Sequence, residues 1–209
     1  MRRLHPLLLA ALIAAALPAA ATTTTVFDNL GAVEGSDPLL SFGPLADSFQ
    51  TGDGDKFLLS QVTALLKSGS ADLVGDVRVS LLADNAGSPG SWLATVGTLS
   101  SAAVSTTSFG AYSFKPTADL QLAGHTTYWL QIDALTPNAV EWAWSSDLSG
   151  IGVAGGANAN ALLGVSSNFA AAPYQMSVSV QAMPVPEPAS LALMLGGIGL
   201  VAVAARRRS

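Results

Sequence analysis

The feature that most limits the fold is the strict alternation of apolar and polar side chains over residues 174–181 (YQMSVSVQ). Successive side chains of a β-strand point to opposite faces, so this period of two directs one row into a core and the other into water. A helix would scatter the same residues around its circumference. The stretch therefore predicts a half-buried antiparallel strand.

The same period of two recurs over residues 76–82 and 126–133. The side chains predicted to face the core are Val77, Val79 and Leu81, and Tyr128, Leu130 and Ile132. Weaker strand patterns, separated by Gly, Pro, Asn and Asp turns, cover residues 26–30, 46–51, 58–66, 92–99, 109–114 and 140–145. The stretch 58–66 is also compatible with a helix. Together these strands predict an all-β, two-sheet antiparallel sandwich of jelly-roll type.

The N-terminus has the features of a secretory signal peptide. Arg2 and Arg3 precede an apolar stretch over residues 7–17, which is too short to span a hydrocarbon layer of about 30 Å. Ala19 and Ala21 then supply the small side chains that a signal peptidase requires. We expect a signal peptide over residues 1–21 with cleavage after Ala21. The alternative is an uncleaved N-terminal anchor.

Residues 22–183 are predicted to form the exported domain. The chain has no cysteine, so its stability must come from a buried core without disulfides. A domain of this size buries about 70% of the surface of its unfolded chain, which suffices. Its four basic and thirteen acidic residues give a formal charge of −9, which argues against a nucleic-acid partner.

Two loops contain oxygen ligands suited to a hard cation. Residues 52–55 (GDGD) place Asp53 and Asp55 two positions apart, and Ca²⁺ prefers six to eight oxygen ligands. No EF-hand pattern follows, so a solvated turn is the simpler interpretation. The stretch 84–90 (DNAGSPG) has the same two interpretations. These loops suggest no cofactor other than a structural Ca²⁺ ion.

Three tryptophans are candidate ligand-stacking residues. Trp142 and Trp144 lie two positions apart in a predicted strand, so they share one face at a separation of about 7 Å. Such a pair would suit polysaccharide stacking, but rings that fill the sandwich core are the simpler interpretation. Trp129 lies on the face opposite the apolar row of its strand. It is a separate surface candidate unless a loop covers it.

Catalytic patterns are weak in this sequence. His125 is the single histidine left after removal of the signal peptide, and its surroundings (GHT) predict a turn into a strand. A Ser-His-Asp triad stays open, but no nucleophile elbow, HExxH motif or P-loop accompanies it. Glu34 and Glu141 are the glutamates available for glycoside hydrolysis. We expect a non-enzyme; the alternative is a secreted hydrolase acting on extracellular polysaccharide.

The C-terminus combines three parts in a fixed order. Residues 185–188 (VPEP) precede an apolar stretch over 189–205, and arginines follow. Seventeen residues is about the lower limit for a transmembrane helix, and the arginines orient its end toward the cytoplasm. The prolines keep the residues before the helix extended. The sequence therefore predicts a sorting segment over 184–209.

This tail resembles the sorting signal of the PEP-CTERM proteins of Gram-negative bacteria. The matching residues are Val185, Pro186, Glu187 and Pro188 in the motif and Arg206, Arg207 and Arg208 in the basic stop. The resemblance implies recognition by an exosortase, a membrane-embedded transpeptidase-like enzyme, after signal peptidase has acted. It also implies transient anchoring in the inner membrane, cleavage near the motif and transfer to the cell surface or extracellular matrix. Such proteins are associated with exopolysaccharide and biofilm formation. The alternative is that the tail stays attached as a plain membrane anchor.

Residues 60–66, 81–90, 122–129 and 142–144 are similar to a secreted-domain family of the choice-of-anchor type, which occurs with various anchoring tails. That resemblance implies no established activity. We therefore expect a sorted surface protein whose sandwich has a structural role or binds polysaccharide.

Overall fold

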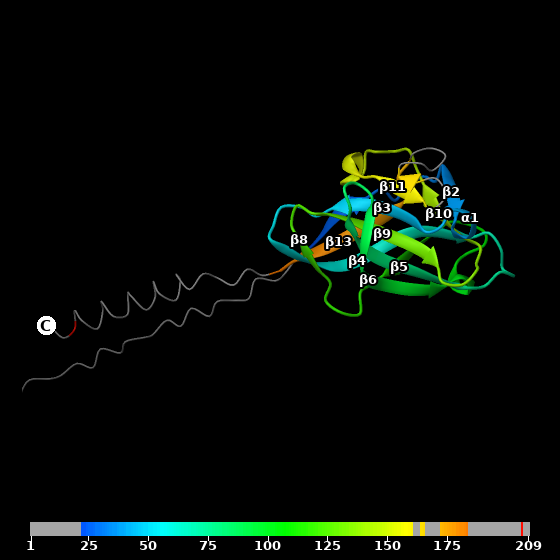
Figure 1. Cartoon of the computed structure of the whole chain (residues 1–209), viewed down its shortest axis with the longest axis horizontal. Helices are drawn as coiled ribbons and strands as arrows, with labels where there is room; N and C mark the ends of the chain where they lie inside the picture. Colours follow the sequence, from blue (N-terminus) through cyan, green and yellow to red (C-terminus); the bar gives the residue numbers. More distant parts are fainter. Residues whose placement is uncertain (1–21, 161–163, 166–171, 184–205, 207–209) are drawn as a thin grey trace, which may run out of the picture.

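All nine stretches with strand patterning form strands in the computed structural model, which describes residues 22–160, 164–165, 172–183 and 206. They are β1 (Thr23–Asp28), β3 (Leu45–Gln50), β4 (Lys56–Ser68), β5 (Asp76–Asp84), β6 (Pro89–Ser100), β7 (Gly110–Phe114), β9 (Thr127–Ala134), β10 (Val140–Trp144) and β13 (Met176–Ala182) (Figure 1). Four short strands that the sequence did not predict are β2 (Gly35–Pro38), β8 (Gln121–Ala123), β11 (Asn158–Asn160) and β12 (Gly164–Val165). Three single turns of helix accompany them: α1 (Leu39–Phe42), η1 (Ser101–Ala103) and η2 (Val153–Gly155).

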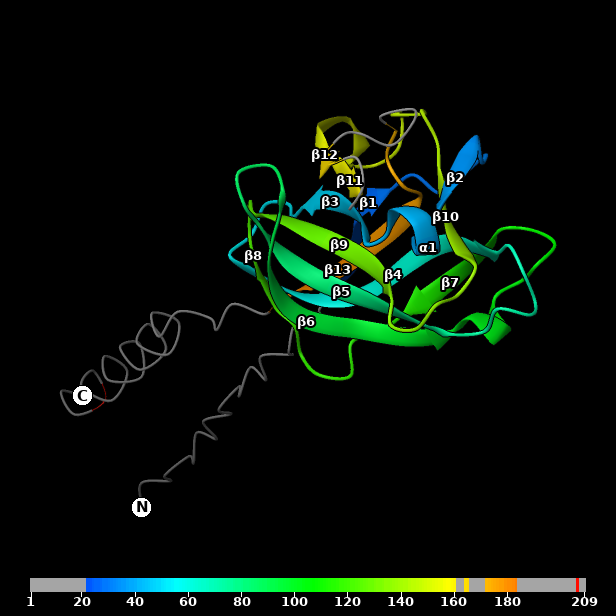
Figure 2. The same cartoon turned by 45° about the vertical axis from the view of Figure 1, so that its right-hand side comes forward.

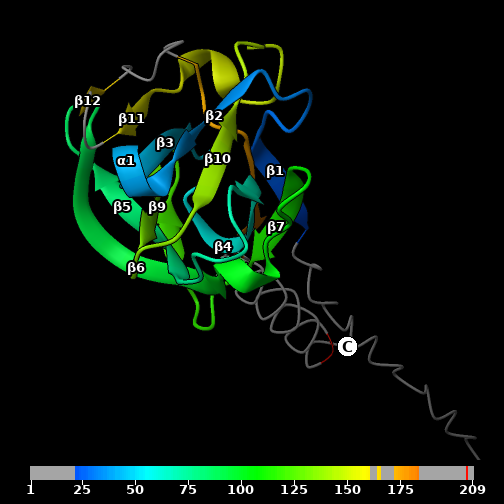
Figure 3. The same cartoon turned by 90° about the vertical axis from the view of Figure 1, so that its right-hand side faces the viewer.

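The strands form two antiparallel sheets that face each other. The first sheet has the order β1-β13-β4-β10-β2, with β7 and β8 also paired to β4, and the second has the order β12-β11-β3-β9-β5-β6. Figure 3 shows β5, β6 and β9 in one layer and β1, β4 and β7 in the other. Figure 2 shows β3, β9, β5 and β6 in succession across the second sheet. The prediction of a two-sheet antiparallel β fold is confirmed.

Four antiparallel strand pairs are nested along the chain. β2 pairs with β10, β3 with β9, β4 with β7, and β5 with β6. The chain therefore folds back on itself about the β5–β6 turn. Of these eight strands, β2, β4, β7 and β10 lie in the first sheet and β3, β5, β6 and β9 in the second.

The stretch with ambiguous patterning, residues 58–66, is part of the long central strand β4. A register irregularity against β13 shifts its pairing between Leu59 and Gln61. Such a bulge changes the phase of the alternation: Leu59 is buried before it, and Val62 and Ala64 are buried after it. This phase change is why the stretch did not show a clean period of two.

The apolar rows that the sequence predicted lie between the two sheets. Met176, Val178 and Val180 have no exposed surface, and the rows of β5 and β9 are also buried. They belong to one continuous cluster that includes side chains from both sheets. Its burial supplies the stability that the sequence cannot obtain from disulfides.

Several predictions of processing fall outside the described residues. These are the signal peptide with Ala19 and Ala21, the motif at 185–188, the apolar stretch 189–205, and the basic end other than Arg206. Within the part of the chain that the structure describes, no helix is long and apolar enough to cross a membrane.

Candidate functional site

Trp142 lies in the core and not on a binding surface. Its side chain has no exposed area, its ring stacks on Tyr174 at 4.7 Å between centroids, and its Nε1 donates to the carbonyl oxygen of Gln175 at 2.9 Å. Trp144 shares that face, is half-buried and packs on the same cluster above Gly35. The proposed stacking platform is therefore wrong for this pair, because the face that they share is the inner one.

Trp129 lies on the outer face of the second sheet, as the alternation predicted, but it is fully buried. It packs in a small second cluster with Ala46, Leu82 and Ala159. The last of these belongs to β11, which the sequence did not predict. The expectation of an exposed stacking ring is wrong here as well, because side chains of β3, β5 and β11 pack around the ring.

Asp84 fixes both the β5–β6 turn and the Trp129 ring. Its carboxylate accepts a hydrogen bond from Trp129 Nε1 at 2.7 Å and from the amide of Gly87 at 3.1 Å. Ala86 and Gly87 have positive φ angles, which suits a tight hairpin turn. The turn interpretation of residues 84–90 is confirmed, and the contact with Trp129 could not have been read from the sequence.

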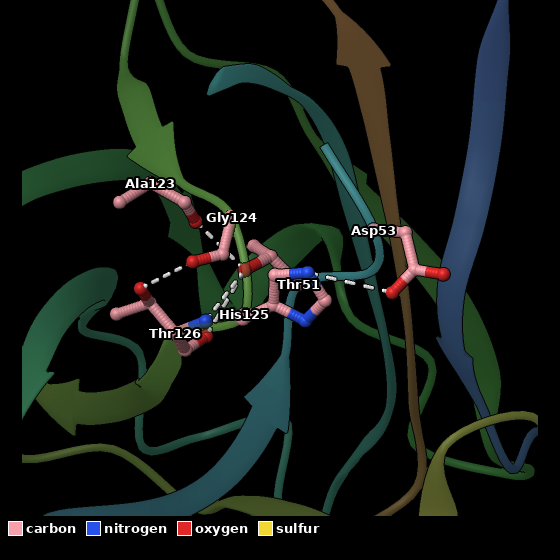
Figure 4. Close-up of polar contacts among 6 residues, drawn as sticks. All are labelled: Thr51, Asp53, Ala123, Gly124, His125 and Thr126. Carbon is pink, nitrogen blue, oxygen red and sulfur yellow. Dashed lines mark hydrogen bonds and ion pairs between the residues drawn. The ribbon is translucent and has the colours of Figure 1, made fainter. Parts of the chain in front are cut away.

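The two turns that carried the calcium and histidine candidates meet at one end of the sandwich (Figure 4). The amide of Gly124 donates to the carbonyl of Asp55 at 3.0 Å, and the amide of His125 donates to that of Gly52 at 3.3 Å. A side chain at Gly124 would collide with the carbonyl oxygen of Gly54. Glycine is therefore required at position 124 for the backbones to approach so closely.

Thr51 holds this junction together. It is 2% exposed, and its Oγ1 donates to the carbonyl oxygen of Ala123 at 2.7 Å while accepting from the amide of Thr126 at 3.0 Å (Figure 4). The hydroxyl of Tyr128 accepts from the amide of Ala123 at 2.9 Å. Buried polar groups that are satisfied in this way make a turn rigid.

His125 is displayed on the surface by this rigid turn. Its φ angle is +49°, a left-handed conformation that few residues other than glycine adopt. Its Nε2 lies 3.5 Å from Oδ1 of Asp53, and both side chains are mostly exposed. Exposed pairs of this kind contribute little to stability. The prediction of a turn at His125 is confirmed.

The candidate calcium ligands lie on the surface of the same junction. Asp53 and Asp55 are exposed, and within the described residues no three His, Asp or Glu side chains cluster closely enough to hold a metal. Calcium binding at these two residues stays a prediction.

Two hollows flank the His125 turn. The larger has a volume of about 560 Å³ and is lined by Ala83, Asp84, Leu93, Gln121, His125, Thr126, Thr127 and Tyr128. The smaller, of about 440 Å³, is lined by residues of β3, by Thr127 and by the segment 150–156. Both volumes fall in the range of small-molecule sites. Thr127 borders both hollows, so they lie on either side of one strand end.

Trp92 is the exposed tryptophan that sequence reasoning missed. It lies in β6 and is 59% exposed, and the next residue, Leu93, is 45% exposed and lines the larger hollow. Trp92 pairs with Leu82 across the strands, which places it on the outer face. One sequence feature could have predicted the exposure of Trp92: it lies in a weakly patterned strand directly after the polar turn 84–90.

The two glutamates considered for hydrolysis have separate partners. Hydrogen bonds from the Ser146 hydroxyl and amide lower the pKa of Glu34, which is opposite to what a general acid needs. Glu141 accepts from the Ser36 hydroxyl at 2.8 Å and lies 3.5 Å from Lys67 Nζ. Neither glutamate lines the hollows beside His125.

These features define a mostly β, two-sheet sandwich that presents two hollows at one end. Comparison with known protein families matches residues 184–208 to the PEP-CTERM protein-sorting motif. The chain therefore carries this sorting motif, as its residues predicted. The motif supports an exported protein that is processed by an exosortase and is transiently anchored in a membrane before sorting. No curated protein matches the chain.

Proposed function

We propose that the sorted protein is a surface or matrix component whose sandwich binds extracellular polysaccharide without cleaving it. The observation that carries this proposal is the larger hollow beside His125, together with the exposed ring of Trp92 next to its lining residue Leu93. The setting is the exopolysaccharide of a biofilm, with which proteins carrying this kind of tail are associated.

The chemistry of the hollow suits a sugar. Asp84, Gln121 and His125 offer acceptors and donors for hydroxyl groups, and Leu93 offers an apolar patch. A few well-placed polar groups beside apolar surface are typical of ligand sites. Asp84 is held in place by Trp129 and Gly87, so this wall is preorganised for binding.

The same proposal includes the finer features of fold and processing. The nested strand pairs, with partners alternating between the sheets as in two Greek keys, support a jelly-roll topology. The apolar stretch 189–205 is proposed as a transmembrane helix behind the sorting motif. Residues 1–21 are proposed as a signal peptide, and the sandwich as a domain of the choice-of-anchor type.

Glycan binding by the purified protein tests the proposal. We expect Trp92→Ala and Gln121→Ala to weaken binding to the polysaccharide of the producing cells by at least about tenfold, which corresponds to about 1.4 kcal/mol. Binding is measured by affinity electrophoresis or calorimetry. Both changes replace partly exposed side chains, so the fold should be retained.

Val74→Ala is the matched control. Val74 is 55% exposed and lies in the β4–β5 connection, at the far end of the 13-residue strand β4 from residues 52–55. Its binding should equal that of the unchanged protein. If all variants bound polysaccharide equally, the proposed binding site would be wrong. Release of reducing sugar ends would favour the alternative, a secreted hydrolase.

A further inference from the structure

Two buried side-chain oxygens lack donors at one place between the sheets. Asp47 in β3 and Asn158 in β11 are directly opposite in the strand register, and they are 0% and 3% exposed. Asp47 Oδ1 accepts from the amide of Ser48 at 2.8 Å. Asp47 Oδ2 and Asn158 Oδ1 have no hydrogen-bond partner in the part of the chain that the structure describes.

The two side chains share the inner face of the second sheet. Asp47 alternates with Leu45 and Phe49, which belong to the main core. Directly opposite residues of antiparallel strands have Cβ atoms about 5 Å apart. Side chains at this Cβ spacing can reach each other, and two acceptor oxygens that meet repel each other unless a proton, a cation or a water molecule lies between them.

Among the described residues, no basic side chain forms an ion pair with Asp47. The strands that pack against β3 are β1, β9 and β11. Their charged residues are Asp28, which accepts from the amide of Leu30 and the hydroxyl of Ser177, and Asp133, which pairs with Arg78 at 2.7 Å. β11 contains no charged residue.

The neighbouring ionisable groups of the first sheet are also engaged. The hydroxyl of Tyr174 donates to Oδ2 of Asp37 at 2.6 Å. Burial raises the pKa of Asp47 well above its ordinary value of 3.8, against smaller opposing effects of the backbone amides of Tyr174 and Ser48. A buried carboxylate without a cation favours its neutral form for this reason.

We propose that Asp47 carries a proton on Oδ2 and donates it to Oδ1 of Asn158, so that the pair forms a proton-dependent latch between β3 and β11. One proton satisfies both oxygens. A calcium ion would need six to eight oxygens, whereas two side-chain oxygens are available here and the strand carbonyls take part in the ladder.

The latch has a consequence for the smaller hollow. The segment 150–156, which ends just before β11, forms one wall of that hollow, and β3 forms the other. Ionisation of Asp47 removes this side-chain donor and leaves only the backbone pairing between the two strands. The hollow should therefore loosen at high pH, and this inference does not depend on the nature of any ligand.

Thermal unfolding of the full chain in mild detergent tests the latch. Because the pKa of Asp47 is raised on folding, its stabilising effect is complete below the unfolded value and is lost as pH rises through the folded value. The midpoint should therefore fall between pH 5 and pH 8. Asp47→Asn supplies a permanent donor, so its midpoint at pH 8 should be at least about 3 °C higher.

Asp37→Asn is the matched buried control and should show no such gain, because Asp37 already has a donor in Tyr174. Infrared spectra at pH 6 should contain a protonated carboxyl band that Asp47→Asn removes. Hydrogen exchange of residues 157–160 at pH 8 should be slower in that variant. The proposal would be overturned if the unfolding midpoints of the unchanged protein and of Asp47→Asn depended on pH in the same way and the protonated carboxyl band were absent. It would also be overturned if added Ca²⁺ raised the unfolding midpoint of the unchanged protein but not that of Asp47→Asn, because a bound cation would then join the two oxygens.

Discussion

Trp142 and Trp129 are both fully buried, but Trp142 lies between the sheets and Trp129 lies on the outer face of the second sheet. Trp142 is enclosed by both sheets and stacks on Tyr174, whereas Trp129 lies outside the second sheet with three buried apolar neighbours. The Nε1 of Trp142 meets a backbone carbonyl, and that of Trp129 meets the Asp84 carboxylate. A ring between the sheets is therefore buried by the fold itself, whereas a ring on the outer face is buried only by a few individual side chains.

The largest expected effect is that of removing the inner ring. Trp142→Ala should lower the free energy of unfolding by about 3 to 5 kcal/mol, because it leaves a cavity between the sheets and removes the stack on Tyr174. Denaturant unfolding measures this change. Trp92→Ala, which removes an exposed ring, should stay within about 0.5 kcal/mol. A cost for Trp142→Ala below about 1 kcal/mol would contradict the comparison.

An intermediate effect is expected from the partner of the outer ring. Asp84→Ala should cost about 1 to 3 kcal/mol, because it leaves the buried Nε1 of Trp129 without an acceptor. In a Trp129→Phe background, where no indole N–H exists, the same change should cost less. Denaturant unfolding of the four proteins gives the coupling energy. If the unfolding free-energy costs of Asp84→Ala and Trp129→Phe simply added in the double variant, Asp84 would stabilise only its own turn and not the Trp129 ring.

The smallest effect is expected at the exposed end. His125→Gly should change the free energy of unfolding by less than about 0.5 kcal/mol, because relief of the positive φ angle offsets the extra entropy of an unfolded glycine. Polysaccharide binding should nevertheless weaken, since the imidazole lines the larger hollow. A stability loss above about 1 kcal/mol would show that His125 is structural. Equilibrium unfolding and glycan titration of the same sample check both expectations.

The alternation of side chains was sufficient to predict the strands and their inner faces. Every residue predicted to face the core in β5, β9 and β13 is buried, because a period of two depends on local geometry alone. The short strands β2, β8 and β11 were missed because three or four residues contain too little pattern. Their formation depends on pairing with distant strands.

The candidate site was less predictable, because its residues meet through long-range contacts. The turns around Asp53 and His125 were identified separately, but about 70 residues separate them in the sequence. Part of the packing around Trp129 comes from Ala159 of β11, whose sequence (NAN) carries no apolar alternation. The opposition of Asp47 and Asn158 likewise depends on strand register. A pattern within one strand predicts none of these meetings.

Met183, the last described residue of the sandwich, lies beside the candidate site. The amide of Met183 donates to the carbonyl of Lys56 at 3.1 Å, and Gly124 binds the adjacent Asp55. Pro188 follows five residues later, at most about 18 Å of extended chain. The sorting motif therefore follows the sandwich at the end that carries the His125 turn, whereas the β4–β5 connection lies at the other end of β4.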